Sequence, residues 1–148
     1  MCEKIEKGWG HELIIESNDQ YCMKELHFDK AGHKSSMHFH KDKTETWLVQ
    51  SGAVSVEIMD MSDASTRKVL IEKGGTLHLK PMTPHQVTSI EDNTVILEAS
   101  SKDTPEDNYR ISPGDSQKNM IEATIDVRPG DYTQGREEYP KVKYTFKT

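Results

Sequence analysis

The segment from Gly32 to Gly52 reads GHKSSMHFHKDKTETWLVQSG and places two histidines, His38 and His40, seven and five residues before Glu45. Side chains at positions i and i+2 of a strand project to the same face of a sheet. A carboxylate five residues past the second histidine can return to that face across a tight turn. Gly32 and Gly52 would permit the turns that bring neighbouring strands together. The spacing therefore predicts that the two histidines and the glutamate converge on one site.

Short runs of alternating residues on both sides of this segment predict an all-β fold. Val54, Val56 and Ile58 alternate with polar residues, and residues 21–28 alternate in the same way. Turn-forming sequences rich in Gly, Asn and Asp separate the runs. Closely spaced strands of this kind are typical of a barrel or a sandwich. We expect them at residues 11–16, 21–28, 45–50, 53–59, 67–71, 76–80, 86–90 and 94–100.

Length, charge and cysteine content exclude several classes of protein. A chain of 148 residues fits one domain. Its 19 basic and 25 acidic residues give a net charge of −6, which argues against a nucleic-acid or anionic-membrane partner. No apolar run approaches the roughly 20 residues of a membrane-spanning helix, and the N-terminus lacks a secretory signal. Cys2 and Cys22 are too few for a disulfide framework, so we expect a cytoplasmic protein.

The chain changes character beyond residue 101. Four of the six prolines lie at position 105 or later, and Pro-Gly-Asp occurs at residues 113–115 and 129–131. Proline followed by glycine suits the centre of a type II turn, so we expect such turns at both places. Residues 120–127 fit either a short helix or a strand. Residues 142–146 fit either a final edge strand or a loosely held arm.

The donor atoms of the central segment predict a metal site. Neutral imidazoles and an ionised carboxylate form the 2-His-1-carboxylate ligand set, which leaves coordination positions open. His85 follows a proline-bearing turn at residues 81–84 and could add a third imidazole. We predict that His38, His40, Glu45 and His85 hold one divalent ion, either Zn, Mn, Fe, Ni or Co. The alternative is that His38 and His40 are exposed side chains on a polar loop.

Residues 32–52 resemble the first motif of the cupin superfamily, G-x5-H-x-H-x3–4-E-x6-G, at every position. The second motif, G-x5-P-x-G-x2-H-x3-N, is matched in part: Gly74 and His85 are kept, whereas Lys80, Met82 and Ser89 replace Pro, Gly and Asn. The likeness covers about residues 8–100. It implies a double-stranded β-helix, the cupin or jelly-roll barrel, with the metal in its mouth. We expect the barrel and its N-terminal strand in residues 1–123, and an irregular C-terminal arm or edge strand in residues 124–148.

A narrower resemblance points to sugar chemistry. The sequences GWGHE at residues 8–12, KEL at 24–26, KSSMH at 34–38 and ETW at 45–47 look like motifs of the cupin domain of type II mannose-6-phosphate isomerases. In that family a glutamine ligand stands at the position of His38, and the family histidine falls on His40. Glu45 and His85 match the remaining ligands. The resemblance implies a metal-dependent isomerase or epimerase. Because cupins of this size are commonly dimers, it also implies a homodimer.

Two further residues are candidates for proton transfer. Aldose–ketose isomerisation moves a proton between adjacent carbons, while a metal would polarise the carbonyl and stabilise the enediolate. Lys24 shares a strand face with apolar residues, and Glu98 lies in an otherwise apolar run. Either could be the catalytic base. The alternatives are a lysine at a strand edge and a glutamate that faces solvent, and the lysines of residues 41–43 are expected to be solvated.

Two other functions remain open. The same ligands suit an iron(II)-dependent dioxygenase of a small molecule, with open positions for O₂ and substrate. A barrel that binds a carbohydrate without chemistry is the third possibility. In each case we expect a small-molecule partner, most simply a carbohydrate, and a homodimer in which the C-terminal arm covers a barrel edge.

Overall fold

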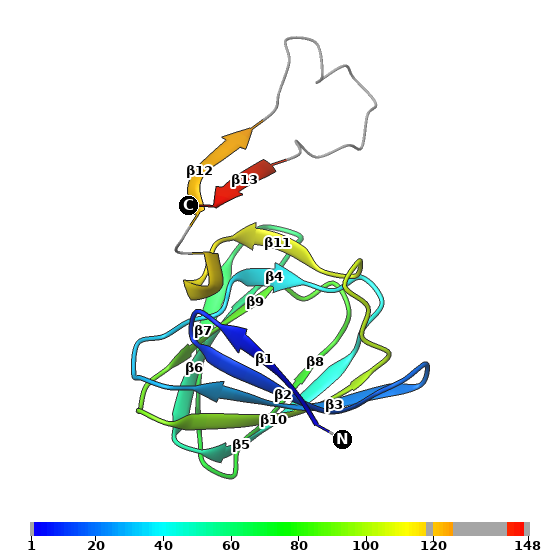
Figure 1. Ribbon diagram of the computed structural model, residues 1–148, viewed down its shortest axis with the longest axis vertical. Helices are drawn as coiled ribbons and strands as arrows, with labels where there is room; N and C mark the ends of the chain where they lie inside the picture. The colour runs from blue at the N-terminus through cyan, green and yellow to red at the C-terminus, as the bar shows by residue number, and fades with distance from the viewer. Residues whose placement is uncertain (1, 118–119, 126–141, 147–148) are drawn as a thin grey trace. The chain divides into compact units, whose positions relative to one another are not determined.

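The computed structural model describes residues 2–117, 120–125 and 142–146, with side chains described as far as residue 117 (Figure 1). The chain divides into two compact units, Met1–Ser116 and Gln117–Thr148. The prediction of an all-β fold is confirmed, because every long element is a strand. In the described part of the chain, no helix has the length and apolar character needed to cross a membrane.

The first unit is built from two antiparallel sheets. One has six strands in the order β1-β2-β3-β10-β5-β8, and the other has five in the order β11-β4-β9-β6-β7. All eight expected runs are strands, whereas β1, β4 and β11 lie outside those runs. A short 3-10 helix, Asp115–Gln117, follows β11. The strands are β1 Glu3–Lys7, β2 Gly10–Ser17, β3 Tyr21–Phe28, β4 Met37–Phe39, β5 Glu45–Ser51, β6 Ala53–Met59, β7 Thr66–Glu72, β8 Thr76–Leu79, β9 His85–Ser89, β10 Thr94–Ser101 and β11 Tyr109–Ser112.

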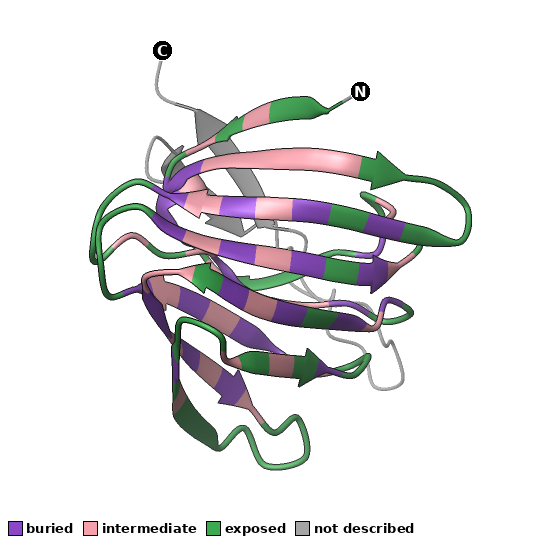
Figure 2. Ribbon diagram, turned by 90° about the horizontal axis from the view of Figure 1, so that it is seen from below, coloured by how far each residue is buried: buried purple, intermediate pink, exposed green. Residues whose placement is uncertain are grey.

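Alternation along the strands places one face of each sheet in a shared core. Figure 2 shows buried residues alternating with less buried ones along neighbouring strands. β6 contributes Val54 and Val56, and Ile96 of β10 is paired with Leu26 of β3 and Val49 of β5. Burial of these side chains stabilises the fold by about 25 cal/mol per Å² of apolar surface. The core comprises Trp9, Leu26, Phe28, Trp47, Val49, Val54, Val56, Ile58, Ile71, Leu79, Val87 and Ile96.

Positive φ angles occur where the cupin-like motifs require turns. Gly52 has a φ of 73°, and a Cβ there would lie 2.2 Å from Thr94 Oγ1, so only glycine fits. Met82 stands where the second motif has glycine, and it still adopts a φ of 62°. Its backbone N–H donates to the carbonyl of His40 over 2.7 Å. The turn therefore keeps the left-handed conformation despite the replacement of glycine.

The prediction of a type II turn at residues 113–115 is wrong. Gly114 does not have the positive φ that the third residue of such a turn requires. A Cβ on Gly114 would lie 2.2 Å from the backbone carbon of Ser35. Glycine is needed there for close packing of two backbone segments, not for turn geometry.

The second unit contains one antiparallel pair of strands. β12, Met120–Ile125, pairs with β13, Val142–Phe146. Residues 120–125 are thus a strand, and the expected final strand at 142–146 is present. The expected boundary between residues 123 and 124 falls inside β12. The Pro-Gly-Asp sequence at residues 129–131 lies outside the described residues.

Candidate metal centre

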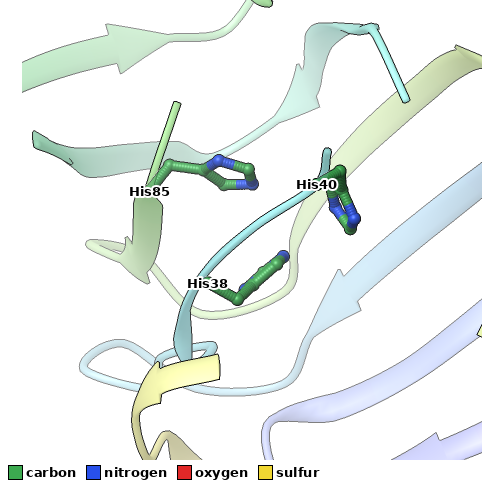
Figure 3. A group of neighbouring side chains, drawn as sticks. All are labelled: His38, His40 and His85. Carbon is green, nitrogen blue, oxygen red and sulfur yellow. The ribbon is translucent and has the colours of Figure 1, made fainter. Parts of the chain in front are cut away.

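Three histidines from neighbouring segments converge in the first unit. His38 lies on β4, His40 on the loop after it, and His85 at the start of β9, where it pairs in register with His38. One ring nitrogen from each of the three lies within 4.8 Å of the other two. Figure 3 shows the three rings pointing toward one another. The interpretation of His38 and His40 as exposed loop residues is therefore wrong.

The outer nitrogen of each ring is held by a backbone carbonyl. A carbonyl oxygen can only accept, so each Nδ1 carries the proton and donates it. In a neutral ring, Nε2 is then left with a free lone pair. Metal-binding histidines in proteins are oriented in this way. The three pairs are His38 with Ser36 (2.9 Å), His40 with Asp107 (2.5 Å) and His85 with Thr83 (2.8 Å).

The surroundings keep at least two of these rings neutral. Burial and the nearby His85 lower the pKa of His38 to about 3. Burial, and after it the Lys43 ammonium, lower the pKa of His40. A neutral imidazole is the form that binds a metal ion.

Glu45 lies beside the three histidines at the start of β5. Its Oε1 is 3.2 Å from His85 Nε2, and its Oε2 is 3.8 Å from His40 Nε2 and 3.1 Å from Lys43 Nζ. Burial alone would raise the pKa of Glu45, but His85 and Lys43 together lower it, so the carboxylate is ionised. Glu45 thus lies next to the three-histidine group and is not part of it.

The contact between Glu45 and His85 fits a bound cation. Among the described residues, neither carboxylate oxygen of Glu45 nor Nε2 of His85 has a hydrogen-bond partner, although all are buried. His85 Nε2 and Glu45 Oε1 thus face each other at 3.2 Å with no hydrogen bond between them. Two ligands about 2.1 Å from one metal ion and about 90–110° apart are separated by roughly 3.0–3.4 Å. The donor set therefore fits a divalent metal ion.

Lys24 and Glu98 both point into the barrel, where they form an ion pair. They are opposite one another on β3 and β10, with Nζ 3.7 Å from Glu98 Oε2. Lys24 is 7% exposed and Glu98 4%, so the edge and solvent-facing alternatives are wrong. Lys24 also lies 3.6 Å from Glu12 and 3.3 Å from Asp103.

The two partners of this pair have shifted pKa values for different reasons. Burial alone would lower the pKa of Lys24, but the carboxylates of Glu98, Glu12 and Asp103 outweigh it and raise the pKa. Lys24 is therefore protonated at neutral pH. Burial, and then the charge of Glu45, raise the pKa of Glu98. A buried carboxyl with a raised pKa holds its proton to a higher pH than a free carboxyl does, which suits a group that exchanges protons.

The sequence did not indicate two residues that contact the candidate metal site. Lys43, expected to be solvated, is 4% exposed and contacts Glu45. Asp107 accepts backbone N–H groups of Lys41 (2.6 Å), Asp42 (3.1 Å) and Lys43 (2.9 Å) with its carboxylate, while its carbonyl accepts from His40. No local pattern marks either residue, because Asp107 binds a loop that is distant in sequence and Lys43 also contacts the distant Glu98 and Asp103.

Comparison with known proteins gives a fold but no close relative. No protein-family model and no curated protein matches the chain. Solved structures do match, among them the capsular polysaccharide assembling protein CapF from Staphylococcus aureus, with 17% identity and a TM-score of 0.68 over 76% of this chain and 34% of CapF. Oxalate decarboxylase from Bacillus subtilis matches with 16% identity and a TM-score of 0.65, over 74% of this chain and 30% of the enzyme. That oxalate decarboxylase has Mn(II) centres.

These likenesses show that the chain has a cupin fold, as its motifs predicted. The chain spans about a third of the length of the proteins that it matches. The narrower likeness to type II mannose-6-phosphate isomerases remains a prediction from the sequence.

Proposed function

We propose that this protein is a metal-dependent cupin that transfers a proton on a sugar or sugar phosphate, as an isomerase or epimerase does. The buried atoms His85 Nε2 and Glu45 Oε1, which face each other at 3.2 Å without a hydrogen-bond partner, carry the metal part of this proposal. His38 and His40 would complete the ligand set. The adjacent buried pair of Lys24 and Glu98 supports the proton-transfer part.

A bound divalent ion would supply Lewis-acid polarisation of the substrate carbonyl. Glu98 is the base in this proposal, because its raised pKa lets it hold a proton reversibly. Lys24 keeps its proton and acts as a hydrogen-bond donor, because three carboxylates surround its ammonium. This proposal thus assigns different roles to Lys24 and Glu98, which the sequence had left as equal candidates for the catalytic base.

Arg110 favours a substrate that carries an anionic group. It pairs in register with His38 across β11 and β4, and paired residues of antiparallel strands project to the same face. Arg110 is exposed, and its strand partner His38 belongs to the three-histidine group. A guanidinium can hold a phosphate with two parallel hydrogen bonds. Sugar phosphates are therefore the first substrates to test.

Deuterium exchange tests the proposal without knowledge of the exact substrate. The metal-loaded protein would be incubated in D₂O with aldoses, ketoses and their phosphates, and exchange beside the carbonyl followed by NMR. We expect exchange with at least one phosphorylated sugar and about 100-fold slower exchange for Glu98→Gln. Metal-bound protein that exchanges none of them would overturn the isomerase proposal and favour a binding module.

An iron(II)-dependent dioxygenase is the second candidate, since the open three-histidine group with an adjacent carboxylate also suits that chemistry. Oxygen consumption distinguishes the two. Protein loaded anaerobically with Fe(II) would be mixed with the same compounds and with O₂. Uptake of O₂ that depends on substrate would favour the dioxygenase.

A further inference from the structure

Lys43 places a buried cation between the metal centre and the charged interior of the barrel. It lies on the loop that joins His40 to β5, and its backbone N–H is held by Asp107 at 2.9 Å. Its Nζ lies 3.1 Å from Glu45, 3.5 Å from Glu98 and 3.3 Å from Asp103. A lysine side chain that is 4% exposed is rare in proteins unless its charge is paired.

The two oxygens of Glu45 have different neighbours because of this lysine. Oε2 is 3.1 Å from the Lys43 ammonium, whereas Oε1 is 3.2 Å from His85 Nε2. Oε2 lies farther from the nearest histidine nitrogen, at 3.8 Å from His40 Nε2. One carboxylate oxygen thus faces the histidines, and the other forms an ion pair with the Lys43 ammonium.

We propose that Lys43 is a positioning residue that restricts Glu45 to one oxygen toward the metal ion and so keeps a coordination position free for substrate. The inference rests on the proposed metal site. A carboxylate can bind a metal ion through one or both oxygens, and an ammonium that holds the second oxygen prevents the bidentate mode. The motif likeness does not include position 43, so this restraint is a property of this chain.

Removal of the ammonium should therefore alter the metal site in a defined way. In Lys43→Met, Glu45 Oε2 is free to bind the ion and displace a water molecule. We expect Mn(II) to bind about 10-fold more tightly, within the range by which such outer partners tune metal affinity. The relaxation rate of water protons in the Mn(II)-loaded protein should fall, because fewer exchanging waters remain on the ion.

Lys24 offers a matched control for charge. It pairs with Glu98 and Asp103, as Lys43 does, but with Glu12 in place of Glu45. Lys24→Met removes the same charge from the same cluster, and we expect no fall in water-proton relaxation. An equal change in both variants would overturn the proposal, because it would show a general effect of charge.

A second pair of variants tests whether Lys43 acts through Glu45. With Glu45→Gln as the background, addition of Lys43→Met should leave both the Mn(II) affinity and the relaxation rate unchanged. The proposal is wrong if Lys43→Met has the same effect in both backgrounds, or if it weakens Mn(II) binding. Should Lys43→Met fail to fold, Lys43→Met combined with Glu98→Gln removes one charge of each sign and carries the same expectation relative to Glu98→Gln alone.

The result for the unmodified protein separates two kinds of failure. If it binds no Mn(II) or other divalent ion, the proposed function fails and the role of Lys43 fails with it. If it binds Mn(II) and Lys43→Met is indistinguishable from it, only the role of Lys43 is overturned.

Discussion

The same three strands line an apolar half and a charged half of the barrel interior. On β3, β10 and β5 the apolar half holds Phe28, Ile96 and Val49, all nearly or fully buried. Two to four residues along the same strand faces, the charged half holds Lys24, Glu98 and Glu45. None of these six residues is more than 7% exposed, so burial alone does not explain the contrast.

The contrast between the halves indicates which of them exists for stability and which for function. Apolar burial stabilises the fold directly. Buried charges cost desolvation energy that their mutual attraction repays only in part, and apolar replacements are often as stable. We therefore expect a chemical use for a cluster in which four buried charged side chains contact two half-buried ones. These residues are Glu12, Lys24, Lys43, Glu45, Glu98 and Asp103.

Truncation in the apolar half should have the largest effect on stability and none on the metal site. Phe28→Ala removes a fully buried ring that stacks on Trp9 at 4.4 Å. We expect a loss of about 3–5 kcal/mol in the free energy of unfolding, measured with urea. Leu70→Ala is the control, because Leu70 is 62% exposed and should change stability by less than about 0.5 kcal/mol. A weaker metal affinity in folded Phe28→Ala protein would contradict the separation of the halves.

Removal of Asp107 should affect both stability and metal affinity. Asp107→Ala leaves the backbone N–H groups of Lys41, Asp42 and Lys43 without their acceptor, although the carbonyl that orients His40 remains. We expect a loss of about 1–3 kcal/mol in unfolding free energy and a 10- to 100-fold weaker metal affinity. Urea unfolding and competition with a chelator measure the two effects. Unchanged metal affinity would show that the loop keeps its geometry without this carboxylate.

Acidification should destabilise the metal-free protein through its buried histidines. The pKa of His38 falls from 6.5 to about 3 on folding, mainly through burial. The unfolded chain therefore binds more protons between these pH values, and stability falls as pH falls from about 6.5 toward 3. The expected slope approaches about 1.4 kcal/mol per pH unit for this histidine. His38→Gln removes this titration, and an equally steep slope in that variant would contradict the assignment.

The smallest effect should come from an exposed ion pair. Lys102 lies 3.1 Å from Asp19, yet both side chains are largely exposed. Lys102→Ala should change the unfolding free energy by less than about 0.5 kcal/mol, because solvent screens exposed pairs. A loss of unfolding free energy as large as that of Asp107→Ala would contradict this expectation. It would show that the distance between the charges, rather than their burial, determines how much an ion pair stabilises this protein.

Local patterns predicted the strands and the histidines because alternation and spacing act over a few residues. The facing of Lys24 and Glu98 into the barrel also follows from alternation along β3 and β10. The positions of Lys43 and Asp107 could not be predicted in this way. Asp107 lies 67 residues from the His40 ring that it orients, and Lys43 lies 60 residues from Asp103.

The dependence on distant partners also explains why the type II turn predicted at residues 113–115 does not form. Pro-Gly-Asp is a local signal for a type II turn, but Gly114 is fixed by its contact with the backbone of Ser35. Glu45 shows this dependence most clearly. Its spacing in the sequence predicted its position beside the histidines. That one carboxylate oxygen faces His85 and the other Lys43 depends on how the loop at residues 40–44 folds.

Metal content tests the central claim most directly. Untagged protein, purified without added metal or chelator and then dialysed against each candidate ion, would be analysed by elemental mass spectrometry beside His40→Ala. We predict close to one divalent ion per chain in the unmodified protein and a loss of at least about 100-fold in affinity in the variant. Absence of bound metal in the folded, unmodified protein after exposure to Zn, Mn, Fe(II), Co and Ni would contradict the account.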